Sequence, residues 1–144
     1  MADGVEYSPM QIEYFSMIQS NISRMATASA LFKGFAATVL AGVVTIAFRD
    51  INPVVLLLMF LPLLAFLMLD VYYLILERKY RYLYELVLAG VHEPNFSMDA
   101  SGVDKTEARA TIPQCLRSLS ISLFYTPVFL AFIILVVLRF SGIG

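Results

Sequence analysis

The chain has 144 residues, of which 60% are hydrophobic and 15% are charged, and its formal net charge is −1. Soluble proteins usually carry about 25% charged residues, so this composition excludes an ordinary soluble domain. A net charge near zero indicates no particular charged partner.

Three apolar runs, at 31–48, 53–76 and 119–138, fill most of the sequence. A bilayer core of about 30 Å requires about 20 apolar residues of helix, and the continuous rather than alternating pattern excludes a transmembrane barrel. We therefore expect an all-α integral membrane protein. Residues 1–144 are expected to form a single membrane domain with three transmembrane helices in a homo-oligomeric bundle.

The first helix is predicted to begin at Ser8-Pro9-Met10-Gln11, where a capping Ser precedes Pro at the first helical position and Gln follows three residues after the cap. Its part at 9–30 is amphipathic and carries few basic residues, which favours packing on protein over packing on a membrane surface. The first transmembrane helix then covers 31–48.

Small residues recur at every fourth position of this first helix. Such rows allow close helix approach in lipid and mark packing interfaces. Packing within one subunit and packing between subunits are equally compatible with the pattern. The row consists of Ala26, Ala30, Gly34, Thr38 and Gly42.

A short turn at 49–52 leads into the second transmembrane helix at 53–76. Pro62 is expected to kink or weaken that helix because its nitrogen cannot donate a hydrogen bond. The helix should continue as a cytosolic extension over 77–90 and stop at Gly90, followed by a cytosolic linker over 91–110 with one helical turn near its end.

The third helix is predicted over 112–139, starting at a capping box formed by Thr111 and Gln114. Its first half contains several hydroxyl side chains. These either bond back to the helix or line a wet path.

Lys33 and Asp70 are the two charged residues expected within the apolar spans, at nearly the same depth from the outer face. Because an unpaired charge in hydrocarbon is costly, we predict that they face each other within a subunit or across an interface. Such a pair is either a fixed structural contact or part of a gate.

Basic residues set the expected orientation. Lys and Arg are enriched on the cytoplasmic side of membrane proteins, and eight of the ten lie on the side of the N-terminus and the linker. We therefore expect a cytosolic N-terminus and an external C-terminus, in a cell membrane. The eight are Arg24, Lys33, Arg78, Lys79, Arg81, Lys105, Arg109 and Arg117, against Arg49 and Arg139.

Cations alternate with tyrosines along the extension of the second helix. Cations suit phosphates and ring faces suit bases, so a nucleotide or oligonucleotide ligand is one interpretation. A self-paired solvent-exposed face and a membrane-interface tyrosine belt are the others. The candidate ligand- or partner-binding residues are Arg24, Arg78, Lys79, Tyr80, Arg81 and Tyr84.

We expect no catalytic site, metal site or cofactor. Cys115 is the only cysteine and His92 the only histidine, and the sequence contains no phosphate-binding glycine loop or nucleophile motif. The protein is therefore not predicted to be an enzyme.

A further pattern covers about residues 20–88 and consists of Arg24-Met25-Ala26, Ser29, Lys33-Gly34, Leu69-Asp70-Val71-Tyr72-Tyr73-Leu74, Glu77-Arg78, Tyr80-Arg81 and Leu83-Tyr84-Glu85. In this pattern the chain resembles small multi-span membrane effectors of bacterial antiphage operons that are partnered with a nucleotidyltransferase, as in the Hailong system and, more distantly, CBASS and SLATT-type effectors. The three predicted spans differ from the two typical of SLATT proteins. The resemblance implies a homo-oligomeric inner-membrane ion channel, controlled by a nucleotide signal, that depolarises the infected cell.

Two functions remain at this stage. The first is an oligomeric channel, a tetramer or similar ring, whose cytosolic helices bind a regulator. The second is a non-conducting membrane anchor or assembly subunit that recruits a soluble partner. A small transporter is disfavoured because the sequence shows no inverted repeat or pair of broken helices.

Overall fold

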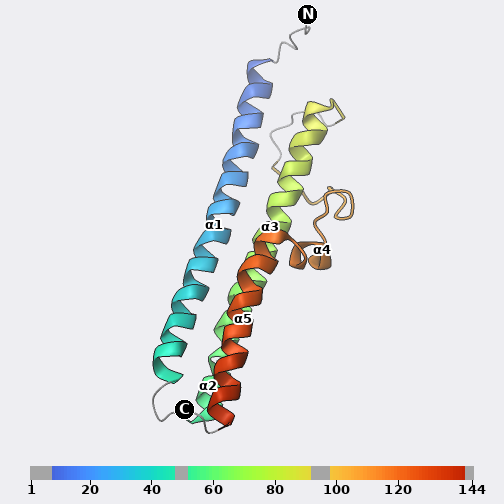
Figure 1. The fold of residues 1–144 in the computed structure, drawn as a ribbon. Coiled ribbons are helices and arrows are strands. Elements are labelled where there is room, and N and C mark those ends of the chain that lie inside the picture. The colour runs from blue at the N-terminus through green and yellow to red at the C-terminus, as the bar shows by residue number, and fades with distance from the viewer. Residues whose placement is uncertain (1–7, 48–51, 92–97, 142–144) are drawn as a thin grey trace, which may run out of the picture.

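The computed structural model describes residues 8–47, 52–91 and 98–141, which form helices and the connections between them (Figure 1). Three helical stretches, at 9–46, 54–88 and 119–140, are long and apolar enough to cross a membrane, which confirms the all-α class and the number of candidate spans within the described residues. The elements are α1 (Pro9–Ala47), α2 (Pro53–Leu58), α3 (Phe60–Leu88), α4 (Ile112–Leu116) and α5 (Leu119–Phe140).

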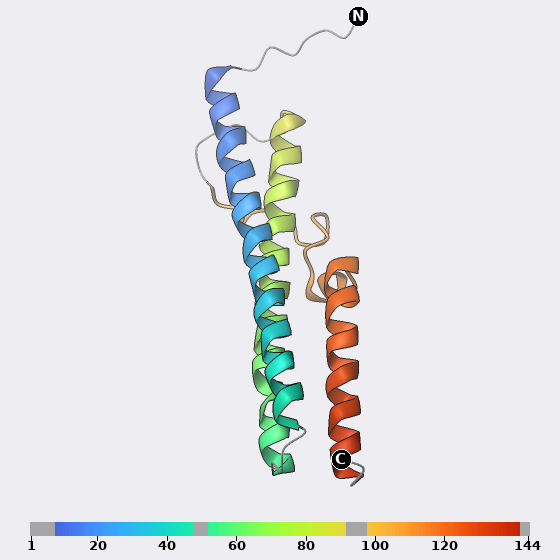
Figure 2. The ribbon, with the colours of Figure 1, turned by 60° about the vertical axis from the view of Figure 1, so that its left-hand side comes forward.

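The long helices lie side by side and nearly parallel to one common axis (Figures 1 and 2). Helix α1 packs mainly against α3, which runs in the opposite direction, and α5 packs against both of them and against α2. The start of α1 and the end of α3 project beyond the start of α5, so a two-helix stalk continues from a three-helix bundle (Figure 2).

The starts of α1 and α2 are each capped by a side chain. At α1 the Ser8 backbone N–H donates to Gln11 Oε1 at 2.9 Å and the Gln11 N–H donates to Ser8 Oγ at 3.3 Å, as predicted for a capping box. At α2 the Asn52 side chain accepts the Val54 N–H at 2.9 Å.

The second span is interrupted at Met59, between α2 and α3. Pro62 lies one turn further on and has no N–H to donate to the carbonyl four residues earlier, so the preceding turn is the one that weakens. The helix then continues to Leu88, and Gly90 follows it with a φ of 70°, a conformation that glycine adopts at little cost.

The third helix differs from its prediction because it is divided in two. Helix α4 ends at Leu116, and α5 begins at Leu119 with Ser118 as its N-cap, whose Oγ accepts the Ile121 N–H at 3.4 Å. A serine that can cap competes with a continuous helix, so the chain bends at 117–118.

Large apolar side chains cover the outside of the bundle. Met68, Leu119 and Leu123 are each more than 70% exposed, as suits surfaces that contact hydrocarbon rather than water. The bundle interior is a cluster from α1, α2, α3, α4 and α5 that includes Ala36, Leu63, Tyr125 and Phe132.

A second apolar cluster lies in the stalk. Tyr14 and Ile18 of α1 and Leu83 of α3 are fully or almost fully buried there, together with residues of the linker such as Val103 and Ala110. The apolar face of the amphipathic segment at 9–30 therefore packs on protein, as predicted. The linker residues 98–110 form turns rather than a helix and lie against the stalk.

Several sequence expectations fall outside the described residues. These are the end of the first helix at Phe48, most of the turn at 49–52, His92, and the chain end at 142–144.

Candidate functional site

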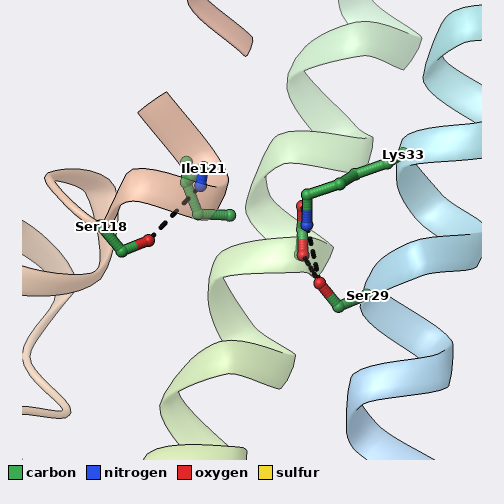
Figure 3. A network of polar contacts seen from close by, with 5 residues as sticks. Ser29, Lys33, Ser118 and Ile121 are labelled. Carbon is green, nitrogen blue, oxygen red and sulfur yellow. Dashed lines mark hydrogen bonds and ion pairs between the residues drawn. The ribbon is translucent and has the colours of Figure 1, made fainter. Parts of the chain in front are cut away.

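A buried charged cluster joins α1 to α3 inside the bundle. Lys33 Nζ lies 2.6 Å from Asp70 Oδ2, with side chains that are 17% and 0% exposed. Ser29 Oγ donates to Asp70 Oδ1 and accepts a hydrogen bond from Lys33 Nζ at 2.8 Å. Figure 3 shows Ser29 and Lys33 on α1 with their side chains directed toward α3. The two ionisable residues predicted to face each other therefore do so within one subunit.

The third helix contributes to the same region. The Tyr125 hydroxyl of α5 is buried and lies close enough to Asp70 to interact with its charge, yet it makes no hydrogen bond of standard geometry with a described residue. Three helices thus meet around one carboxylate, and a change in its charge would act on the contacts of all three.

Ser29 and Tyr125 were not singled out from the sequence as partners of Asp70. Ser29 precedes Lys33 by four residues, which places both on one helix face, and this spacing is the signal that could have identified it. Tyr125 carries no comparable signal, because its approach to Asp70 depends on how α5 packs.

Three of the candidate ligand-binding residues donate hydrogen bonds to the backbone of the linker or the segment before α4. Lys79 Nζ donates to the Ala100 carbonyl at 3.1 Å, Tyr80 OH donates to the Met98 carbonyl at 2.7 Å, and Arg78 Nη1 donates to the Arg109 carbonyl at 2.6 Å. Lys79 is 9% exposed. Lys79 and Tyr80 therefore have their polar atoms directed at the linker backbone rather than at an open surface.

The other three candidates lie along the groove between α1 and α3. Arg81 and Tyr84 line a hollow of about 390 Å³ with Gln19 and Ile22 of α1. Arg24 lines a neighbouring hollow of about 430 Å³. Arg81 also forms an ion pair with Glu77 at 2.8 Å, and the centre of the Tyr84 ring lies 5.0 Å from the centre of the Phe15 ring.

The row of small residues on α1 is exposed along its whole length: Ala26, Ala30, Gly34, Thr38 and Gly42. A methyl group added at Gly34 or Gly42 would meet no atom of another part of the chain within 4 Å. This helix face is therefore not used for packing within the described part of the subunit. The Thr38 hydroxyl donates to the Gly34 carbonyl at 3.0 Å, so it satisfies its donor without a partner helix.

Two carboxylates order the linker. Asp104 Oδ1 accepts the Thr106 N–H at 2.6 Å and the Glu107 N–H at 3.2 Å, and these bonds lower the pKa of its carboxyl. Asp99 accepts the Ser101 hydroxyl and N–H, each at 2.8 Å, and its pKa is lowered for the same reason. Both carboxylates thus act as turn formers.

Among the described residues, no group of three or more His, Cys, Asp or Glu side chains is arranged to hold a metal ion. Comparison of the chain with protein-family models, curated proteins and solved structures finds no match.

Proposed function

We propose that the chain is the subunit of a homo-oligomeric membrane channel, a tetramer or similar ring, whose opening is controlled by a nucleotide-type ligand. In this proposal it resides in the inner membrane of a bacterium, with the stalk and N-terminus in the cytosol and the C-terminus outside. It acts as an effector that dissipates the membrane potential in antiphage defence, with a nucleotidyltransferase as partner.

The observation that carries the proposal is the bare row of small residues on α1. A helix face with only small side chains makes few contacts with lipid tails, whereas a second helix can approach such a face closely. Because Gly34 and Gly42 face open space in the single chain, a second copy is the natural occupant. A ring built through this face would bring hydroxyl-bearing faces of α1 or α5 toward a common axis.

The cluster at Asp70 supports a gate. It links α1, which carries the proposed subunit contact, to α3, and these two helices together form the stalk. A ligand that binds the stalk and displaces α3 relative to α1 would change this ion pair. Such a ligand can shift the closed–open equilibrium only by the difference between its affinities for the two arrangements. Arg24, Arg81 and Tyr84 along the groove supply cations and a ring face for such a ligand.

Ion flux from liposomes tests the proposal. Vesicles that are loaded with K⁺ and contain the purified full-length protein should release K⁺ without added valinomycin. Added nucleotides or oligonucleotides should change the rate of this release. An Asp70→Asn variant should alter the rate, whereas the exposed Tyr72→Phe variant should match the wild type. Protein that is inserted and folded but gives no flux with any of these ligands contradicts the proposal.

A non-conducting anchor is the second candidate, and one observation favours it. The linker is bonded to α3 through Lys79 and Tyr80 and buries its apolar residues against the stalk, which creates an ordered surface outside the bundle. Oligomeric state separates the two functions: a ring with a polar axis supports the channel, and a monomer supports the anchor.

A further inference from the structure

An arginine-lined hollow lies where α3, α4 and α5 meet. It measures about 530 Å³, and its lining consists of Arg78, Arg109, Gln114, Arg117 and Ser118. It is separate from the groove between α1 and α3 and from the buried cluster at Asp70.

The positive charge of this hollow is not neutralised within the described part of the chain. There, no carboxylate comes within ion-pairing distance of the guanidinium groups of Arg78, Arg109 or Arg117. Like charges that share a small volume repel one another, and a bound anion removes that cost. The arrangement therefore favours an anionic ligand.

One of the arginines is held in place. Arg78 Nη1 donates to the Arg109 carbonyl at 2.6 Å, in the segment before α4, and to the Gln114 carbonyl at 3.4 Å, within α4, so these bonds tie its guanidinium to both. Its remaining N–H groups stay available. Planar guanidinium groups match phosphate oxygens with paired hydrogen bonds, so a phosphate suits the site better than a simple halide.

Apolar surface begins directly below the hollow. Ser118 caps α5, and the next residue, Leu119, is 80% exposed, followed one turn later by Leu123 at 72%. Because α5 is a candidate membrane span from Leu119 onward, the hollow lies at the level where the span meets the lipid headgroups. A ligand here would meet cations at its head and exposed leucines beside its tail.

We propose that this hollow binds the phosphate group of an anionic phospholipid. Basic pockets beside membrane helices are known to hold such headgroups. Soluble phosphates share the same chemistry, so the test has one arm for each source. The site is independent of ion conduction and goes beyond the channel proposal.

The first arm measures lipid retention. Full-length protein in nanodiscs of phosphatidylcholine and phosphatidylglycerol is released into mild detergent, and bound phosphatidylglycerol is counted by native mass spectrometry. Arg109→Gln and Arg117→Gln should each lower the affinity for phosphatidylglycerol by about fivefold. Lys105→Gln, an exposed cation on the same linker but outside the hollow, should leave it within about twofold. The Arg109 and Arg117 side chains donate no hydrogen bond in the described structure, so both variants should fold, which circular dichroism checks.

The second arm adds inorganic pyrophosphate to protein in phosphatidylcholine nanodiscs and follows the unfolding temperature. Phosphatidylglycerol retention that depends on the two arginines supports the lipid assignment. Stabilisation by pyrophosphate without phosphatidylglycerol retention overturns the lipid assignment and shows that the phosphate is soluble. Arginine variants that behave like wild type in both arms overturn the site altogether. A silent flux assay changes none of these results, because binding is measured without conduction.

Discussion

Lys33 on α1 and Asp70 on α3 form an ion pair with 2.6 Å between Nζ and Oδ2, and the carboxylate side is completely buried. A buried ion pair adds little stability compared with a well-packed apolar pair, but removing one partner leaves the other charge buried and unpaired. The pair is therefore best tested as a pair.

The first prediction is a double-mutant cycle at this pair. Asp70→Asn should lower the free energy of unfolding by about 3 kcal/mol, because the Lys33 ammonium loses its carboxylate. The double variant Lys33→Met/Asp70→Asn should recover at least about half of that loss. Titration of detergent-solubilised protein with dodecyl sulfate measures both values. Arg24→Met removes an exposed cation on the same helix and should lower the free energy of unfolding only slightly. A double variant whose loss equals the sum of the Asp70→Asn and Lys33→Met losses would contradict the coupling.

The second prediction concerns the small-residue face of α1. A Cβ at Gly34 or Gly42 meets no atom of another part of the subunit within 4 Å and both positions are exposed, so the unfolding temperature of Gly34→Leu and Gly42→Leu subunits should hold or rise. Each should reduce cross-linked oligomer in membranes, because a bulky side chain prevents close helix approach. Ala65→Leu, at an exposed site on α3, is the matched control and should leave the oligomer intact. Unchanged cross-linking in both glycine variants would show that this face is not the contact.

The third prediction concerns the bonds from α3 to the linker. Tyr80→Phe removes the donor to the Met98 carbonyl and should cost about 1 kcal/mol of local stability. Lys79→Met removes the Lys79 donor to the Ala100 carbonyl, which in the described structure then accepts only the Val103 N–H at 3.3 Å. Both variants should speed tryptic cleavage at Lys105 and Arg109 in the native protein, whereas Tyr72→Phe should not. Equal cleavage in all variants would mean that these bonds do not order the linker.

These linker contacts mark the limit of what the sequence could predict. Apolar runs, capping residues and helix-breaking residues act locally, so the three spans, the start at Ser8 and the stop at Gly90 were predictable. The Lys33 and Asp70 pair followed from matching depths and the cost of a bare charge in lipid. The path of the linker depends instead on which α3 side chains its carbonyls meet. No hydrophobic periodicity or residue spacing in the sequence indicates these contacts. For this reason the sequence did not predict the bonds of Lys79 and Tyr80 to the linker backbone.

The fourth prediction is a pH dependence of linker order. Asp104 accepts backbone hydrogen bonds as a carboxylate, so its pKa is lower in the folded linker than in the unfolded chain. Its contribution to stability is therefore complete above the unfolded value of about 3.9 and is lost as the pH falls from there through the folded value. Asp104→Asn should weaken linker protection at neutral pH and flatten this acid limb. Amide hydrogen exchange of residues 104–110 from pH 6 to pH 2.5, corrected for intrinsic rates, measures both effects. An acid limb of equal size in the variant would contradict the assignment.

The fifth prediction uses Cys115, the only cysteine in the chain, to report how α4 docks. Its side chain is fully buried, and burial raises the pKa of the thiol more than the nearby Arg78 charge lowers it. Because the thiolate is the reactive form, a maleimide reagent at pH 7.5 should label the native protein slowly. Arg78→Gln removes the bonds to the Arg109 and Gln114 carbonyls, which both precede the cysteine in the chain, so α4 should open more often and labelling should become about tenfold faster. Arg81→Gln is the matched control, since Arg81 lies one turn along α3 and pairs only with Glu77 in the described structure. If Arg81→Gln accelerated labelling as much as Arg78→Gln, the effect would come from lost charge on α3, and the proposed clamp of Arg78 on α4 would be wrong.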